Sequence, residues 1–158
     1  PARIVSDYLD VYDLTDIRIE HYHAVHKQRA ARVRYPLAAD ITGKRVLLVD
    51  DVSDSGSTFE TAIQHLREHG EPAQLGTAVM PHKRVSRYRQ DFYAEEVGEW
   101  HWIIYPWAVM EDLRSFLHDM QPAPATVGEF ARQLYVRHGI EVGQQTLHDV
   151  FAMSRDRD

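Results

Sequence analysis

A run of acidic, hydroxyl-bearing and glycine residues follows a short apolar stretch near the middle of the chain. The run consists, in order, of Val46 to Val49, the acidic pair Asp50 and Asp51, and the loop Asp54-Ser55-Gly56-Ser57-Thr58. A loop of small residues that leads from a strand into a helix turns several backbone N–H groups toward one point, where the helix dipole adds partial positive charge. Three hydroxyl side chains in the loop supply further donors. The run therefore predicts a phosphate-binding loop.

The acidic pair restricts what kind of phosphate compound would bind. Two adjacent carboxylates repel a phosphate unless they face something else, and vicinal hydroxyls or a divalent cation are suitable partners. A sugar phosphate offers hydroxyls and phosphate together. Taken singly, acids after a strand often cap the next helix, and Ser/Gly/Thr clusters form ordinary turns. Only the conjunction favours a sugar-phosphate site.

The same run resembles the 5-phosphoribosyl-1-pyrophosphate (PRPP) signature of the type I phosphoribosyltransferases, and it matches neither a Walker A loop nor a Rossmann fingerprint. The resemblance implies that Asp50 and Asp51 hold the ribose hydroxyls. It implies that Asp54, Ser55, Gly56, Ser57 and Thr58 bind the 5′-phosphate. By the same likeness, Asp54 is the catalytic acid/base that handles the purine ring proton. Mg²⁺ is the implied cofactor, carried by the pyrophosphate, with Asp50 and Asp51 as candidate ligands.

A second part of the chain resembles the base-binding half of the hypoxanthine, xanthine and guanine phosphoribosyltransferases. It comprises His82-Lys83-Arg84, Gln90 to Ala94 and Trp102 to Trp107, and the likeness covers most of Pro1 to Leu117. It implies that Lys83 donates to the purine 6-oxo group, that Trp102 stacks on the ring and that the backbone of Ile103 contacts its edge. A cation distinguishes a keto acceptor from an amino donor, and an aromatic face offers apolar area to a flat ring.

Ordinary structural roles compete with these assignments. A lysine is commonly a solvated surface residue, and a tryptophan on a strand commonly belongs to the core. The lysine register also allows a shift of one or two positions around Lys83. Where the family often has a carboxylate after the Pro-Trp pair, this chain has Ala108, so Glu111 or Asp112 is the alternative contact for a purine 2-substituent.

The resemblance implies transfer of the 5-phosphoribosyl group from PRPP to a 6-oxopurine base (hypoxanthine, guanine or xanthine) in purine salvage. The products are a purine nucleoside 5′-monophosphate and pyrophosphate, and the basic stretch Lys27 to Arg34 would close over the site and exclude water. A homo-oligomer is expected, with PRPP and the base as small-molecule partners. A non-catalytic PRPP-binding regulator is the alternative from another class, and a transferase acting on adenine is a third.

Hydrophobic periodicity and breakers predict the elements that position these residues. We expect, in order, strands at Asp16–Tyr22, Ala31–Tyr35 and Arg45–Val49, a helix at Phe59–His69, a strand at Gln74–Met80, an irregular segment at Pro81–Gly98 and a strand at Trp100–Tyr105. Strands alternating with helices indicate an α/β fold, a three-layer arrangement in which a sheet of mainly parallel strands carries helices on both faces.

The two ends of the chain extend this scheme. Ile4, Val5, Tyr8 and Leu9 fall on one face of a short helix, and the strand and pyrophosphate loop that precede this helix in the family have no counterpart here, so we expect an N-terminally incomplete domain. Two amphipathic stretches, Val127–His138 and Gln144–Met153, predict a helical hairpin. The expected domains are a phosphoribosyltransferase domain at residues 1–120 and a linker with a helical tail at residues 121–158.

Composition excludes several classes of protein. The 158 residues are 44% hydrophobic, enough for a core, and no apolar run approaches the about 18 residues that cross a bilayer. The chain has no cysteine and a formal charge of -6, which disfavours disulfide scaffolds, thiolate metal sites and nucleic-acid partners. We expect a cytoplasmic protein with no membrane partner. His21 and His23 could share a strand face and hold a metal, but a rim of titratable side chains is the favoured interpretation.

Overall fold

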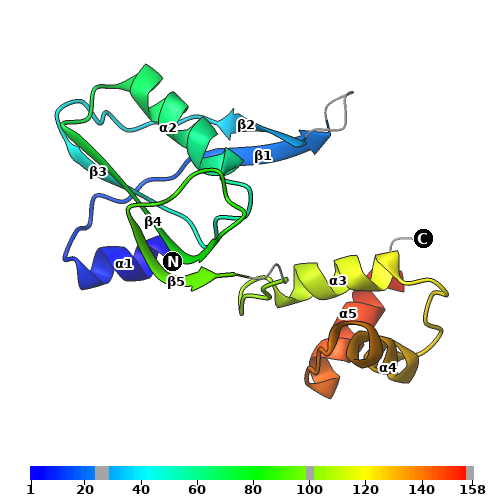
Figure 1. The fold of residues 1–158 in the computed structure, drawn as a ribbon. Helices are drawn as coiled ribbons and strands as arrows, with labels where there is room; N and C mark the ends of the chain where they lie inside the picture. The colour runs from blue at the N-terminus through cyan, green and yellow to red at the C-terminus, as the bar shows by residue number, and fades with distance from the viewer. Residues whose placement is uncertain (24–28, 99–101, 156–158) are drawn as a thin grey trace. The chain divides into compact units, whose positions relative to one another are not determined.

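The computed structural model describes residues 1–23, 29–98 and 102–155 of the chain. It divides into two compact units, Pro1–His101 and Trp102–Asp158, and each is described by itself (Figure 1). No helix among the described residues is long and apolar enough to cross a membrane.

The first unit is built on a three-stranded parallel sheet in the order β3-β4-β5. Its strands are β3 (Arg45–Val49), β4 (Gln74–Lys83) and β5 (Phe92–Val97), and α2 (Ser57–His69) is the crossover that joins β3 to β4. Parallel neighbours require such a crossover, and a sheet covered by helices favours the apolar run that forms β3. The predicted α/β class with a parallel sheet is confirmed.

One face of α2 supplies the core of this unit. Leu66 of α2 is buried with Leu37 and Ile41, and Val46, Leu48 and Leu75 from β3 and β4 pack against this cluster. Phe59, at the start of the helix, is also almost fully buried. Burial at both ends of α2 fixes its axis on the sheet, and with it the position of its N-terminus. The short helix α1 (Ala2–Tyr8) lies at the start of the same unit.

A separate two-stranded antiparallel sheet precedes β3. It is formed by β1 (Arg18–His23) and β2 (Arg29–Tyr35), with Ile19 opposite Val33 and His21 opposite Ala31. Both strands expected in this part of the chain are confirmed, and the second begins earlier than expected. Lys27 of the predicted lid lies outside the described residues, so the closure of this stretch over the site stays a prediction.

The expectations for the stretch after β4 are wrong in two places. The segment predicted to be irregular contains the end of β4 and all of β5, and residues 102–105 form no strand in the described part of the chain. Phe92 and Tyr93 favour a strand although Glu95 and Glu96 make the segment polar. Within the helical unit, the Trp102 ring instead meets the ring of Phe116, with centroids 6.1 Å apart, and the Tyr105 and Trp107 rings stack with centroids 4.8 Å apart.

Three helices form the second unit: α3 (Val109–Asp119), α4 (Val127–His138) and α5 (Gln144–Arg155). Their shared core consists of Leu113, Met120, Phe130, Leu134, Leu147, Val150 and Phe151. Thr126 caps α4 by accepting a hydrogen bond from the Glu129 N–H at 3.2 Å, and Gly139 ends it in a left-handed conformation. The two predicted tail helices are confirmed, and α3, which was not predicted, packs with them. The expected domain boundary after residue 120 stays a prediction.

Candidate functional site

The loop between β3 and α2 brings the open end of a helix to the carboxyl end of the sheet. Gly56 is the N-cap of α2, with φ of 83°, and it has no side chain that could cap the helix. The first N–H groups of a helix have no partner within it, so this end of α2 offers donors and positive potential to an anion. Ser55 and Ser57 flank the same point, with their hydroxyl oxygens 2.9 Å apart.

The segment that follows β4 packs directly against this loop. A Cβ placed on Gly56 would lie 2.6 Å from the backbone nitrogen of Tyr88 and 2.9 Å from the Ser86 hydroxyl, closer than real contacts allow. The Arg87 N–H donates to the Ser55 carbonyl at 3.1 Å, and the Phe59 and Tyr88 rings stack with centroids 5.8 Å apart. Glycine is therefore required at position 56 both for its φ and for the close approach.

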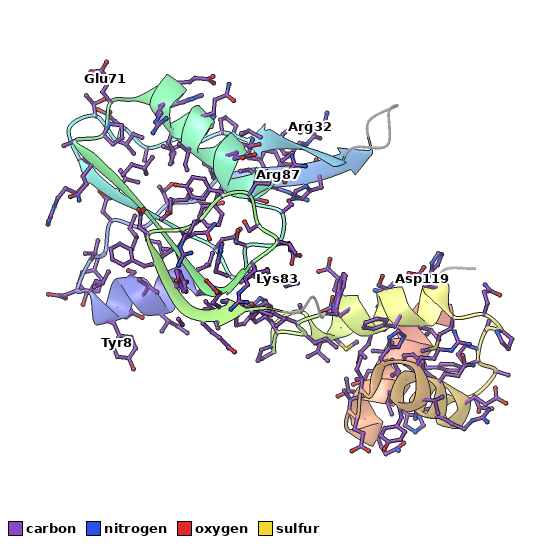
Figure 2. All side chains as sticks on the ribbon, viewed as in Figure 1. Tyr8, Arg32, Glu71, Lys83, Arg87 and Asp119 are labelled. Atoms are coloured by element: carbon purple, nitrogen blue, oxygen red, sulfur yellow. The ribbon has the colours of Figure 1, made fainter. Side chains whose placement is uncertain are left out.

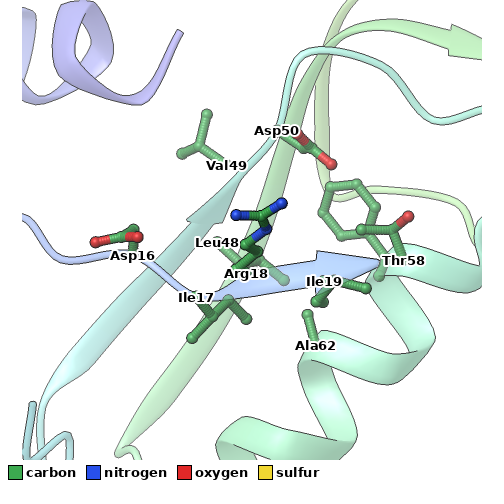
Figure 3. Close-up of a pocket in the computed structure, with 10 residues that line it drawn as sticks. Asp16, Ile17, Arg18, Ile19, Leu48, Val49, Asp50, Thr58 and Ala62 are labelled. Carbon is green, nitrogen blue, oxygen red and sulfur yellow. The ribbon is translucent and has the colours of Figure 1, made fainter. Parts of the chain in front are cut away.

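Asp50 lies at the end of β3 on the wall of a cavity of about 370 Å³. Figure 3 shows Asp50 on this wall together with Thr58 and with Arg18, which comes from β1 and lines the same cavity. Burial raises the pKa of Asp50 to about 6, opposed by a hydrogen bond that its Oδ1 accepts from the Asp51 N–H at 3.0 Å. Burial disfavours the charged form unless a ligand supplies partners for it.

Asp54 and Lys83 form an ion pair at the other side of the loop. The Lys83 Nζ contacts the Asp54 Oδ1; Lys83 is 4% exposed, whereas the Asp54 side chain is 57% exposed. Lys83, labelled in Figure 2, is the last residue of β4. Its N–H donates to the Ser53 carbonyl at 3.1 Å. The alternative of a solvated surface lysine is therefore wrong. The two flanking residues have other partners: the buried His82 has its Nδ1 2.8 Å from the Gln90 Oε1, and Arg84 pairs with Glu96 at 2.7 Å.

The remaining base-site residues belong to the second unit. Trp102 is 55% exposed and meets the Phe116 ring edge-on at 6.1 Å, so it is not a fully buried core residue. Ile103 is partly buried. Glu111 and Asp112 stand in the first turn of α3. Their roles in purine recognition stay predictions.

Two residues next to the loop escaped the sequence analysis as parts of this site. His21 reaches Thr58 from β1, with its Nε2 3.1 Å from the Thr58 hydroxyl oxygen, and Arg18 lines the cavity of Asp50. Both depend on the packing of the β1-β2 hairpin against α2, which leaves no mark in local sequence. Among the described side chains, no cluster of three His, Cys, Asp or Glu residues could hold a metal ion. Asp50 and Asp51 fit Mg²⁺, which takes one or two protein carboxylates and completes its shell with ligand oxygens.

A family model described as a phosphoribosyl transferase domain matches residues 1–112 of the chain. The chain belongs to the phosphoribosyltransferase domain family. Among solved structures, the purine phosphoribosyltransferase of Pyrococcus horikoshii Ot3 is similar at 30% identity and a TM-score of 0.59, covering 68% of this chain and 69% of that one. The xanthine-guanine-hypoxanthine phosphoribosyltransferase of Helicobacter pylori shares the fold, with a TM-score of 0.59, 23% identity and coverage of 72% and 73%.

Curated relatives of this phosphoribosyltransferase-domain protein include bifunctional PyrR proteins and a hypoxanthine-guanine phosphoribosyltransferase. The bifunctional protein PyrR 1 of Lactiplantibacillus plantarum is 36% identical over 88 residues, which cover 54% of this chain and 48% of the relative. The hypoxanthine-guanine phosphoribosyltransferase of Rattus norvegicus is 32% identical over 81 residues, covering 49% and 37%. The chain spans half or less of the length of these relatives.

The contact of Gly56 with Tyr88 predicts a difference between two glycines that share a left-handed conformation. Gly56→Ala should lower the free energy of unfolding by clearly more than Gly43→Ala, because Gly43 (φ 69°) has no atom within 4 Å of its would-be Cβ. Gly43→Ala should cost about 1 kcal/mol from φ alone. Urea unfolding of both variants measures this, and equal costs would show that the close approach is unimportant.

Burial of Asp50 predicts a pH-dependent stability. The pKa is about 6 in the folded state against 3.8 ordinarily, so between about pH 4 and 6 the folded protein keeps a proton that the unfolded chain releases. Stability contributed by the protonated form is thus lost as the pH rises through this window. Asp50→Asn should remove that slope and raise the free energy of unfolding at pH 7 by up to about 3 kcal/mol.

Urea unfolding between pH 4 and 8 measures the Asp50 effect. Asp119→Asn, at an exposed position in α3, is the matched control and should leave the pH profile unchanged. An Asp50→Asn profile that overlays the parent would contradict the assignment of an ionised, buried carboxylate.

Proposed function

We propose that this protein transfers the 5-phosphoribosyl group from PRPP to a 6-oxopurine base and releases pyrophosphate. The observation that carries the proposal is the ion pair of Lys83 with Asp54 beside the Gly56 loop. It joins a buried cation, suited to a purine 6-oxo acceptor, to an exposed carboxylate suited to proton transfer, at the edge of a helix N-terminus suited to phosphate.

The reaction is a displacement at the anomeric carbon, in which the bond to pyrophosphate oxygen breaks as a ring nitrogen of the base attacks. The proposed work of the protein is to align both reactants and to stabilise the developing charge. Asp50 and Asp51 hold the ribose hydroxyls, and the N–H and hydroxyl groups of residues 54–58 hold the 5′-phosphate. Mg²⁺, when bound with PRPP, neutralises charge on the pyrophosphate leaving group.

Asp54 and Lys83 divide the work on the base. Lys83 donates to the 6-oxo oxygen, and Asp54 accepts the proton that the attacking base loses. In the free protein the two side chains neutralise each other, which explains how Lys83 is tolerated while almost fully buried. Binding of a 6-oxopurine gives Lys83 a further acceptor, and the exposed Asp54 remains accessible to the ring nitrogen.

A second candidate function follows from one comparison. The relatives named bifunctional protein PyrR share sequence with this chain, including 36% identity over 88 residues in the L. plantarum protein. A PRPP-binding regulator, with or without transfer to uracil, is the corresponding proposal. The buried Lys83 favours the enzyme, because a PRPP sensor needs no cation for a base.

The test is formation of nucleotide from PRPP and Mg²⁺ with hypoxanthine, guanine, xanthine, adenine and uracil in turn. We expect product with a 6-oxopurine, and a fall of about 10²–10⁴-fold in Asp54→Asn, since this removes the proton acceptor. Lys83→Met should raise KM for the base more than KM for PRPP.

Asp119→Asn serves as the charge-matched control and should retain full activity. Product with uracil alone, or PRPP binding without turnover on any base, would overturn the 6-oxopurine proposal in favour of the regulator.

A further inference from the structure

A chain of hydrogen-bonded polar side chains, three of them buried and one half-buried, adjoins the phosphate loop, outside the residues assigned to the substrates. His82 lies in β4, and Gln90 lies in the segment before β5. Ser53 immediately precedes the phosphate loop, and Ser86 lies in the segment after β4. The His82 Nδ1 lies 2.8 Å from the Gln90 Oε1, and the Gln90 Nε2 donates to the Ser53 hydroxyl at 2.8 Å. Ser53 and Ser86 share a hydrogen bond of 2.8 Å between their hydroxyls.

Burial makes the completeness of this chain important. Ser53 is 2% exposed, Gln90 3% and His82 4%. A buried donor or acceptor that loses its partner cannot recover one from water, so a partly broken network is worse than none. Each of these three side chains has a hydrogen-bond partner within the network.

Only one direction of donation satisfies every member. The Ser86 hydroxyl donates to the Tyr88 carbonyl at 2.8 Å, and a carbonyl can only accept, so Ser86 must accept from Ser53. Ser53 has then spent its proton and must accept from the amide nitrogen of Gln90. The amide oxygen therefore faces His82, whose Nδ1 must carry a proton. A reversed Gln90 would require a second proton on Ser86.

The two ends of this hydrogen-bonded chain of side chains lie next to the parts of the site that must be aligned. Ser53 immediately precedes Asp54, and its backbone is hydrogen-bonded to the end of β4. The Ser53 N–H donates to the Pro81 carbonyl at 3.3 Å, and the Ser53 carbonyl accepts from the Lys83 N–H at 3.1 Å. His82 immediately precedes Lys83. At the other end, Ser86 and Tyr88 form the wall that Gly56 touches.

We propose that the His82-Gln90-Ser53-Ser86 chain positions the phosphate loop against β4 and thereby sets the geometry of Asp54 relative to Lys83 and to the 5′-phosphate donors. The proposal rests on the function given above. These four are positioning residues, because their side chains act through the loop. Because only one direction of hydrogen-bond donation is permitted, the network holds the loop in one conformation. Pre-organisation of this kind increases both substrate affinity and reaction rate.

Ser86→Ala is the test, because it removes the hydroxyl that connects Ser53 to Tyr88 without adding charge or bulk. We expect KM for PRPP to rise and kcat to fall, so that kcat/KM for PRPP decreases by about five- to tenfold in total, the effect of about one net hydrogen bond on loop geometry. Ser86→Thr keeps the hydroxyl and should restore most of the activity. Ser6→Ala is the control, since Ser6 is a buried serine of the same unit whose hydroxyl donates to the Val11 carbonyl.

A readout independent of turnover separates this proposal from the proposed function. In the ¹⁵N-labelled protein at about pH 8.5, where a histidine is neutral, the His82 nitrogen shifts should report the Nδ1–H form. Ser86→Ala should move the amide resonances of Ser55 to Thr58, whereas Ser6→Ala should not.

The outcomes are distinct. Movement of the loop amides with no turnover in the parent protein would support the positioning chain and refute the transferase. Unmoved loop amides in Ser86→Ala, an Nε2–H form of His82, or equal kinetic effects of Ser86→Ala and Ser6→Ala would overturn the positioning chain.

Discussion

The geometry of the site depends on the close approach of Gly56 to the backbone of Tyr88. A Cβ at position 56 would lie 2.6 Å from the backbone nitrogen of Tyr88, which is closer than real contacts allow. The loop after β3 and the segment after β4 can therefore meet only through a glycine with positive φ. This contact aims the N-terminus of α2 across the end of the sheet. The ring stack of Phe59 on Tyr88 extends the same contact into the helix.

Charge is the second constraint, and it acts against stability. Asp50 is kept largely out of water, which raises its pKa to about 6, and Lys83 is almost fully buried in an ion pair with Asp54. Neither arrangement is one that folding alone would favour. Both arrangements are consistent with a site whose proposed ligand brings hydroxyls, phosphate oxygens and a keto group to these charged side chains. Such conflicts between stability and local chemistry are typical of functional sites.

Local sequence was sufficient for the parts of the site that lie in one stretch. The strand Arg45–Val49, the loop to Thr58 and helix α2 follow each other directly, so residue order conveys their geometry. Lys83 could be singled out only through a family likeness, and its burial and its pairing with Asp54 became evident from the fold. His21 and Arg18 were missed as parts of the site because β1, which is distant in sequence from the loop, brings them there.

Propensity failed where packing decided which of two segments would join the sheet. Phe92–Val97 pairs with β4, whereas Trp102, in the segment that was expected to be a strand, contacts the ring of Phe116 in α3. Strand propensity describes how well a residue fits a half-buried pleated surface, and it does not say which segment will find such a surface. The helix α3 likewise was not predicted, because it packs through Leu113 against Phe130 and Leu147 of the two later helices, which local sequence does not indicate.

The central claim is that the loop before α2 holds the phosphate of a phosphoribosyl group, and titration of the ¹⁵N-labelled protein with ribose 5-phosphate tests it most directly. We predict saturable changes in chemical shift that are centred on the amides of Ser55, Gly56, Ser57 and Thr58, because these N–H groups are the proposed phosphate donors. Saturable binding that leaves these four amides unmoved, or no binding at all, would contradict it.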